Sequence, residues 1–174
     1  PGLVIYRFDA PLFFANAEDF RDGVLEAIAR RNEPVRWVVI GAEPITDFYQ
    51  GQRNEGLPAS ERTEVRVLFD DAGIYVGLRA WDSEPEKMKI RAIFRDEAGG
   101  ADELVSLMLD AYHGQRSAIQ FVTNANGLME DLLQTGESTA TRNHDWDAVW
   151  YSQGRRLPDG FEVEVAIPFK SLRF

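Results

Sequence analysis

The distribution of apolar residues changes near residues 44–47, and this change limits what the chain can fold into. Residues 4–40 contain apolar runs around one amphipathic stretch, a pattern that predicts strands and a helix. From residue 45 onward, short runs alternate between apolar and polar side chains and are separated by turns that contain Asp and Gly. We therefore expect two parts, residues 1–44 and 45–174, whose functions must be argued separately.

The first part predicts the element order β-β-α-β. Residues 3–8 and 12–15 are β-rich runs separated by a turn, and residues 35–40 form an apolar run typical of buried strands. Between them lies a helix whose apolar side chains recur at helical spacing, namely Phe20, Val24, Ala27 and Ile28. Because an unpaired sheet edge invites aggregation, we expect residues 35–40 to pair with an exposed edge of the second part.

Charge and composition exclude several functions. The formal net charge is −10, most of it in residues 45–174, whereas nucleic-acid binding depends on Lys and Arg that neutralise phosphates. The chain has no cysteine, which excludes thiol catalysis and disulfides but leaves the localisation open. No apolar run reaches about 18 residues, so we expect no membrane insertion of this segment. The ends of the chain suggest a segment excised from something larger.

The second part predicts a mainly β fold, an antiparallel β-sandwich. Residues 62–69 and 74–81 flank a turn in which Gly73 is expected to have a positive φ, and residues 155–160 are expected to form the last turn. Further strand-like runs are residues 88–94, 104–112, 117–123, 148–153 and 161–167. Alternation within 74–81 places Ile74, Val76, Leu78 and Ala80 on the core face, and Tyr75, Gly77, Arg79 and Trp81 on the other.

Two resemblances to known families follow from these residues. The sequence "PGLVIYRFDAPLFFANAEDFRDGV…VRWVVIGAEPITD" resembles the start of the STAS domain of sulphate-permease-type anion transporters. This resemblance implies a regulatory segment in the cytoplasm. In that family, the next segment is a loop that leads into a helix, and this loop carries the regulatory Ser or Thr. Phe48, Tyr49, Gln50 and Gly51 stand in their place, so we do not expect the STAS function here.

Residues 45–174 resemble the family 9 carbohydrate-binding module found at the N-terminus of outer-membrane barrel proteins. The resemblance rests on "ASERTEVRVLFDDAGIYVGLRAWDSEP", "DELVSLMLDAYHGQRSAIQFVTNANG" and "DWDAVWYSQGRRLPDGFEVEVAIPFKSLRF". It implies a β-sandwich in the periplasm or at the cell surface that binds sugars without cleaving them, often with structural calcium. The family's opening and closing strands are missing, so we expect a sandwich truncated at both ends within an apparent chimera.

Sugar recognition needs flat aromatic faces together with planar amide or guanidinium groups that bind hydroxyls. The candidate ligand-binding residues are therefore Trp146 and Trp150 as stacking surfaces, followed by Trp81, Arg79, Gln120 and Asn124. The alternative for each tryptophan is a place in the core, which is the commoner role in a small sandwich.

Acidic residues suggest two further roles. Asp102, Glu103 and Asp110 bracket a predicted strand and could hold structural calcium, while paired carboxylates could also serve a glycosidase. The resemblance to a non-catalytic module makes an enzyme the less favoured reading, and any activity would belong to an O-glycosyl hydrolase with which such a module is associated. The sequence leads us to favour binding of an oligosaccharide or polysaccharide. A structural or interaction fragment without ligand, and a STAS-type regulatory segment of an anion transporter, are the alternatives.

Overall fold

The computed structural model describes residues 3–8, 17–30, 37–42, 44–51, 54–98, 102–111, 116–135 and 142–172. Its strands are β1 (Leu3–Phe8), β2 (Trp37–Ala42), β3 (Thr63–Phe69), β4 (Gly73–Trp81), β5 (Val105–Leu109), β6 (Ser117–Thr123), β7 (Glu130–Thr135), β8 (Arg142–Asn143), β9 (Tyr151–Leu157) and β10 (Gly160–Pro168). The helix α1 spans Ala17–Ala29, and two short 3-10 helices, η2 and η4, span Pro85–Lys87 and Phe169–Ser171.

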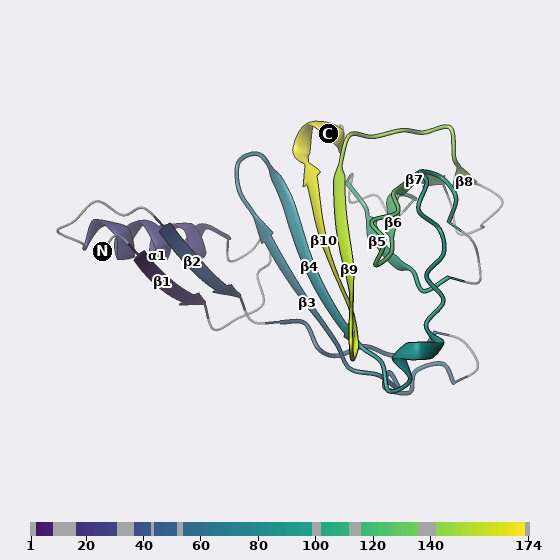
Figure 1. Ribbon diagram of the computed structural model, residues 1–174. Helices are drawn as coiled ribbons and strands as arrows, with labels where there is room; N and C mark the ends of the chain where they lie inside the picture. Colours follow the sequence, from purple (N-terminus) through teal and green to yellow (C-terminus); the bar gives the residue numbers. More distant parts are fainter. Residues whose placement is uncertain are drawn as a thin grey trace.

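Two antiparallel four-stranded sheets form a β-sandwich, which confirms the predicted fold class. The strand order is β3-β4-β10-β9 in the first sheet and β5-β6-β7-β8 in the second. Figure 1 shows the two sheets as separate layers. β3 and β5 are end strands of their sheets, so their outer edges have no neighbouring strand in the described part of the chain.

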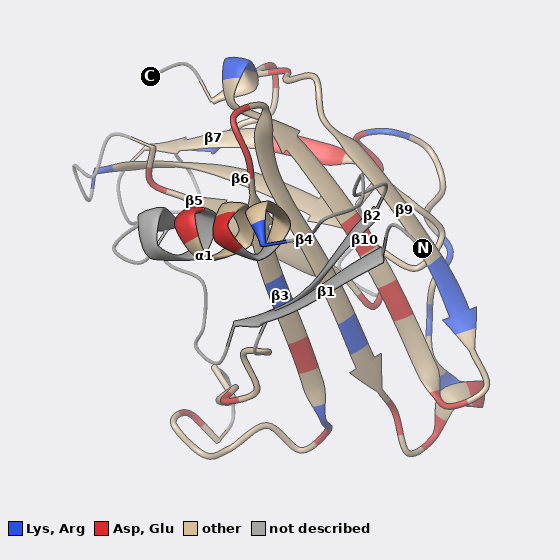
Figure 2. Ribbon diagram, turned by 90° about the vertical axis from the view of Figure 1, so that its left-hand side faces the viewer, with Lys and Arg blue, Asp and Glu red and all other residues tan. Residues whose placement is uncertain are grey.

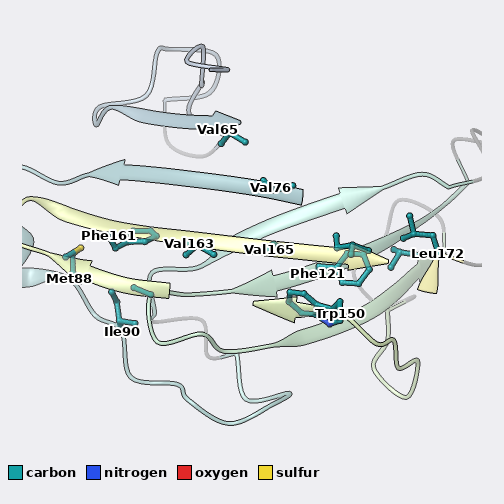
Figure 3. Close-up of a cluster of buried hydrophobic side chains, with 13 residues drawn as sticks. Val65, Val76, Met88, Ile90, Phe121, Trp150, Phe161, Val163, Val165 and Leu172 are labelled. Carbon is teal, nitrogen blue, oxygen red and sulfur yellow. The ribbon is translucent and has the colours of Figure 1, made fainter. Parts of the chain in front are cut away.

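The core fills the space between the two sheets. Because side chains alternate along a strand, every second residue of β10 points inward, and Phe161, Val163, Val165 and Ile167 are all buried. Phe121 of β6 meets them from the second sheet and is fully buried (Figure 3). The core face predicted for β4 is confirmed, since its four members all belong to the core cluster or pack against it.

The turn between β3 and β4 differs from the prediction in its glycine. Asp70 shapes this turn, because its carboxylate accepts hydrogen bonds from the backbone N–H groups of Ala72 (2.8 Å) and Gly73 (3.0 Å). Gly73 is not in the positive-φ region. Glycine is needed there for space, since a Cβ would lie 2.5 Å from the carbonyl oxygen of Ile167.

The other strand predictions had mixed outcomes. Residues 117–123 form β6 with the predicted bounds, while β9 begins later than predicted and continues to Leu157, into the predicted turn. Residues 88–94 form no strand, although Met88 and Ile90 enter the core from this irregular segment. The sequence pattern did not predict β7, which begins with two acidic residues, Glu130 and Asp131.

The first part of the chain contains a β-α-β unit. β1 and β2 pair in parallel, from Leu3 opposite Trp37 to Phe8 opposite Ala42, with α1 between them in sequence. The predicted strand at residues 12–15 lies outside the described residues. For the described residues 37–40, the predicted pairing of residues 35–40 with the sandwich is wrong, because β2 pairs with β1. A bridge between Ile45 and Val65 reaches the edge of β3 instead.

Figure 1 places the β-α-β unit on the side of the first sheet that points away from the second sheet. Within the described residues, no helix has the length and apolar character needed to cross a membrane.

Candidate functional site

The outward face of the sheet β3-β4-β10-β9 carries an ordered set of side chains. This face is turned toward the viewer in Figure 2. The strand register aligns its side chains in rows that run across four strands. One row consists of Leu68, Tyr75, Ala166 and Tyr151, and the next of Arg66, Gly77, Glu164 and Gln153.

These two rows surround a hollow of about 810 Å³. Ala166 lies between the two tyrosines, and Gly77 lies between Arg66 and Glu164, so small residues form the floor and larger ones the sides. A Cβ placed on Gly77 would meet no atom within 4 Å. The hollow therefore exists because two positions in the middle of the sheet lack bulky side chains.

Two further hollows adjoin the first and lengthen it into a groove along the strands. One of about 580 Å³ shares Tyr75, Tyr151 and Ala166 with it and extends to Asp71 and Lys170. The other, of about 250 Å³, shares Gln153 and Glu164 and extends to Arg155 and Glu162. We call the three hollows together the outer groove.

Aromatic faces are accessible in the outer groove. Tyr151 is 62% exposed and Tyr75 is 38% exposed. The Tyr75 hydroxyl lies 3.2 and 3.3 Å from the two carboxylate oxygens of Asp70 and donates to that group. Partial burial and the Asp70 charge raise the pKa of Tyr75, so the phenol keeps its proton at physiological pH.

A row of charged side chains that form ion pairs lies at one end of the groove. Glu64, Arg79, Glu162 and Arg155 lie side by side across the four strands. The Arg155 Nε lies 2.5 Å from Glu162, and Glu64 pairs with both Arg62 and Arg66. Hydrogen bonding from Arg62 is the main reason why the pKa of Glu64 is lowered. The two glutamates and two arginines of this row balance in charge.

Trp81 and Arg79 lie on the same outward face, beyond the groove. The guanidinium carbons of Arg62 and Arg79 lie 4.3 and 4.8 Å from the centre of the Trp81 ring. Arg79 also pairs with Asp159 and donates to the carbonyl oxygen of Phe161 at 3.1 Å. The structure thus brings together these two predicted residues, but two guanidinium groups already contact the indole.

Trp150 occupies the core, which corrects its predicted role as a stacking surface. Its side chain is only 2% exposed, its ring packs against Phe121 at 5.1 Å, and its Nε1 donates to Asp131 at 3.0 Å. Trp146 is partly buried and meets the edge of the same phenylalanine ring at 6.3 Å. A buried indole has no face to offer a sugar, so we exclude Trp150 from the site.

Gln120 and Asn124 are likewise buried, in the second sheet and the turn that follows β6. Asn124 donates to the carbonyl oxygen of Ala92 (2.9 Å) and accepts from the backbone N–H groups of Asn126 and Leu128. Gln120 donates to the Ser106 hydroxyl at 2.7 Å. These bonds hold local structure together, and neither residue reaches the outer groove.

The acidic residues proposed as calcium ligands are not gathered into one group. The Asp102 carboxylate accepts backbone hydrogen bonds from Ala92 (2.7 Å) and Arg91 (2.9 Å), which lower its pKa. Over the described ranges, no three His, Asp or Glu side chains lie close enough to hold a metal ion. Asp102 therefore fixes a loop, while Glu103 and Asp110 do not join it around a common point.

Comparison with known proteins gives matches to two separate classes. A stretch of 43 residues is 56% identical to a probable sulfate transporter of Mycobacterium tuberculosis, in strain CDC 1551 / Oshkosh and equally in strain H37Rv. The stretch covers 25% of this chain but only 8% of the transporter. It supports the resemblance of the first part to a transporter segment and extends no further.

Among solved structures, the chain is similar to a carbohydrate binding module family 9 from Caldicellulosiruptor kristjanssonii in complex with cellotriose. The TM-score is 0.45 at 13% identity, over 95% of this chain and 67% of that chain. For the complex with glucose the TM-score is 0.42 at 13% identity, over 96% and 69%. No model of a protein family matches the chain. The sandwich assignment rests on the two sheets described above.

Proposed function

We propose that the chain binds carbohydrate in the outer groove without cleaving it. The observation that carries the proposal is the pair of exposed tyrosines, Tyr75 and Tyr151, on either side of Ala166. Exposed aromatic rings offer apolar faces to the C–H surfaces of a sugar, and their hydroxyls stay in water. Binding would cost little conformational entropy in the protein, because the sheet already fixes the backbone of both tyrosines.

Polar groups beside the tyrosines suit the hydroxyl groups of such a ligand. Gln153 offers an amide that both donates and accepts, Glu164 offers acceptor oxygens, and Arg66 offers planar donors. All three belong to the row next to the tyrosines, so a ligand stacked on the aromatic row reaches them within two strand steps, about 7 Å. This combination of apolar floor and few polar groups is typical of small-molecule sites.

The length of the groove favours an oligosaccharide over a single sugar. The three adjoining hollows extend along β10 from Pro168 to Glu162. Six strand steps correspond to about 20 Å, well beyond the size of one pyranose ring. We therefore expect affinity to rise with chain length, from glucose to cellotriose.

Titration calorimetry with glucose and cellotriose tests the proposal. We expect the Tyr151→Ala variant to bind cellotriose about tenfold more weakly, because a loss of about 1.4 kcal/mol corresponds to one lost stacking contact. Tyr49→Ala is the matched control, since Tyr49 is equally exposed at 66% but lies away from the groove. A folded wild-type chain that gives no heat with any sugar would support the structural-fragment alternative instead.

A further inference from the structure

An apolar cavity of about 390 Å³ opens on the side of the sandwich where β3 and β5 end their sheets. It lies between the layers, on the opposite face of β3 from the outer groove. Its walls are the inward side chains of β3, β4, β5 and β10 together with Ile45, whereas Ser106 and Met108, whose side chains point to the other face of the edge strand β5, lie at its rim. The lining residues are Ile45, Val65, Val67, Phe69, Ile74, Val76, Ser106, Leu107, Met108, Leu109 and Ile167.

The wall chemistry restricts what can enter. Among the described residues that line the cavity, ten are apolar, Ser106 is the only one with a polar side chain, and none carries a charge. An ionised group inside would lack a partner, which is strongly unfavourable in an apolar environment. The cavity volume lies within the range of about 300–1,000 Å³ that small-molecule sites occupy. These properties select an uncharged ligand whose buried portion is hydrocarbon.

Packing around the cavity is incomplete without an occupant. Val67, Ile74 and Leu107 pack against the core cluster yet remain partly exposed, because the space beside them is not filled by protein. Apolar side chains that line a void lack dispersion contacts on that side. A hydrocarbon chain in the cavity would restore these contacts and remove the side chains from water.

The mouth of the cavity adds one polar feature. Met108, which is 54% exposed, and Ser106 both lie on the edge strand β5. The Ser106 hydroxyl oxygen already accepts a hydrogen bond from Gln120 Nε2, so its own hydrogen is available to donate. Because alternation turns Ser106 away from the core, its hydroxyl lies at the outer rim of the edge strand, where it can meet an alcohol or ester oxygen on the end of a ligand that emerges from the cavity. A flexible methionine at the rim can adapt to the ligand.

We propose that this cavity binds a neutral amphiphile, with an unbranched alkyl or acyl chain between the sheets and a neutral oxygen beside Ser106. The site is independent of the carbohydrate proposal. Its walls are inward side chains such as Val65 and Val67, whereas the outer groove uses the outward residues of the same strand, such as Arg66.

Displacement of the neutral fluorophore N-phenyl-1-naphthylamine by 1-dodecanol tests the site. We expect saturable binding, displacement by dodecanol and a dodecanol-dependent rise in the unfolding temperature. Because no described residue that lines the cavity carries a positive charge, dodecanoate should displace the fluorophore at least about tenfold less effectively. Equal displacement by dodecanoate, or no fluorophore binding by the folded chain, overturns the proposal.

Two variants fill the cavity from opposite sheets, namely Val67→Phe and Leu107→Phe. Each should bind the fluorophore about tenfold more weakly or not at all, and should unfold at a higher temperature in the absence of dodecanol. If one of them does not fold, the other decides. Ile93→Phe is the matched control, because Ile93 is an exposed apolar residue outside the cavity. Unchanged binding by a folded filling variant contradicts the proposal. A second result would also contradict the proposal. If the chain does not bind dodecanol but forms a dimer, and Met108→Lys abolishes that dimer, the occupant of the cavity is a second copy of the chain.

Discussion

Replacing Asp131 by alanine should lower the free energy of unfolding by about 2–5 kcal/mol, because two buried donors lose their acceptor and each unsatisfied donor costs about 1–3 kcal/mol. The Asp131 side chain is only 1% exposed and accepts hydrogen bonds from the Ala148 backbone N–H (2.6 Å) and from Trp150 Nε1 (3.0 Å). It also pairs with Arg95. The alanine variant would leave two donors without their acceptor inside the protein.

The large effect follows from what Asp131 connects. Its carboxylate joins β7 to the segment that leads into β9 and, through Arg95, to the irregular segment after β4. Urea denaturation followed by tryptophan fluorescence would measure the loss. Asp147→Ala is the matched control. Asp147 pairs with the same arginine but its side chain is 77% exposed, so we expect a loss below about 1 kcal/mol. Equal losses in the two variants would contradict the network.

The pH dependence of the same network provides a second readout. Burial raises the pKa of Asp131 above its ordinary 3.8, more than the bonds from Trp150 and Ala148 and the Arg95 charge lower it. Because the folded-state pKa exceeds the unfolded one, protonation favours folding. The stability of the wild type relative to Asp131→Asn should therefore be greatest below pH 3.8 and fall as the pH rises through the folded-state pKa. Comparison with the asparagine variant removes the titration of all other groups.

Alternation along the chain was enough to predict most of the sandwich. β6 was predicted with its bounds, and the two faces of β4 were sorted correctly from the period of two. This works where a strand has one buried and one solvated face. It failed at residues 88–94, where Met88 and Ile90 are buried although the backbone forms no strand. Burial there depends on loop packing against the core, which carries no period.

The tryptophans show why the candidate site could not be read from residue types alone. Trp146 and Trp150 are four residues apart, and in an extended segment such positions point to the same side. The sequence does not say which side. The structure turns both toward Phe121, while Val149 and Tyr151 between and after them are exposed. The aromatic residue that faces solvent is therefore Tyr151, the neighbour of the predicted Trp150.

Register between strands was the other missing information. The sequence placed Tyr75 on the outward face of β4 but could not show which residues lie beside it. Ala166 of β10 pairs with Tyr75 on one side and with Tyr151 on the other, which brings two tyrosines from distant parts of the chain onto one surface. Such a pairing depends on the order β4-β10-β9, because the middle strand supplies the small residue between them.

Substituting isoleucine for Gly77 should abolish carbohydrate binding and leave the fold intact. Gly77 is in the middle of β4, is not among the positive-φ glycines and has open space where a Cβ would stand. A β-branched residue suits a strand better than glycine, so the free energy of unfolding should stay the same or rise by up to about 1 kcal/mol. The new side chain would occupy the floor of the outer groove between Arg66 and Glu164.

A ligand that stacks on the tyrosine row must lie above that floor, so we expect cellotriose affinity to fall at least about a hundredfold, equivalent to about 2.8 kcal/mol. Calorimetry measures the affinity, and urea denaturation shows that the variant is folded. Gly51→Ile is the matched control, because Gly51 also has open space around a Cβ but lies outside the groove. Unchanged cellotriose binding by the folded Gly77→Ile variant would place any sugar site elsewhere on the molecule, since a filled groove leaves no room for a ring between the two rows.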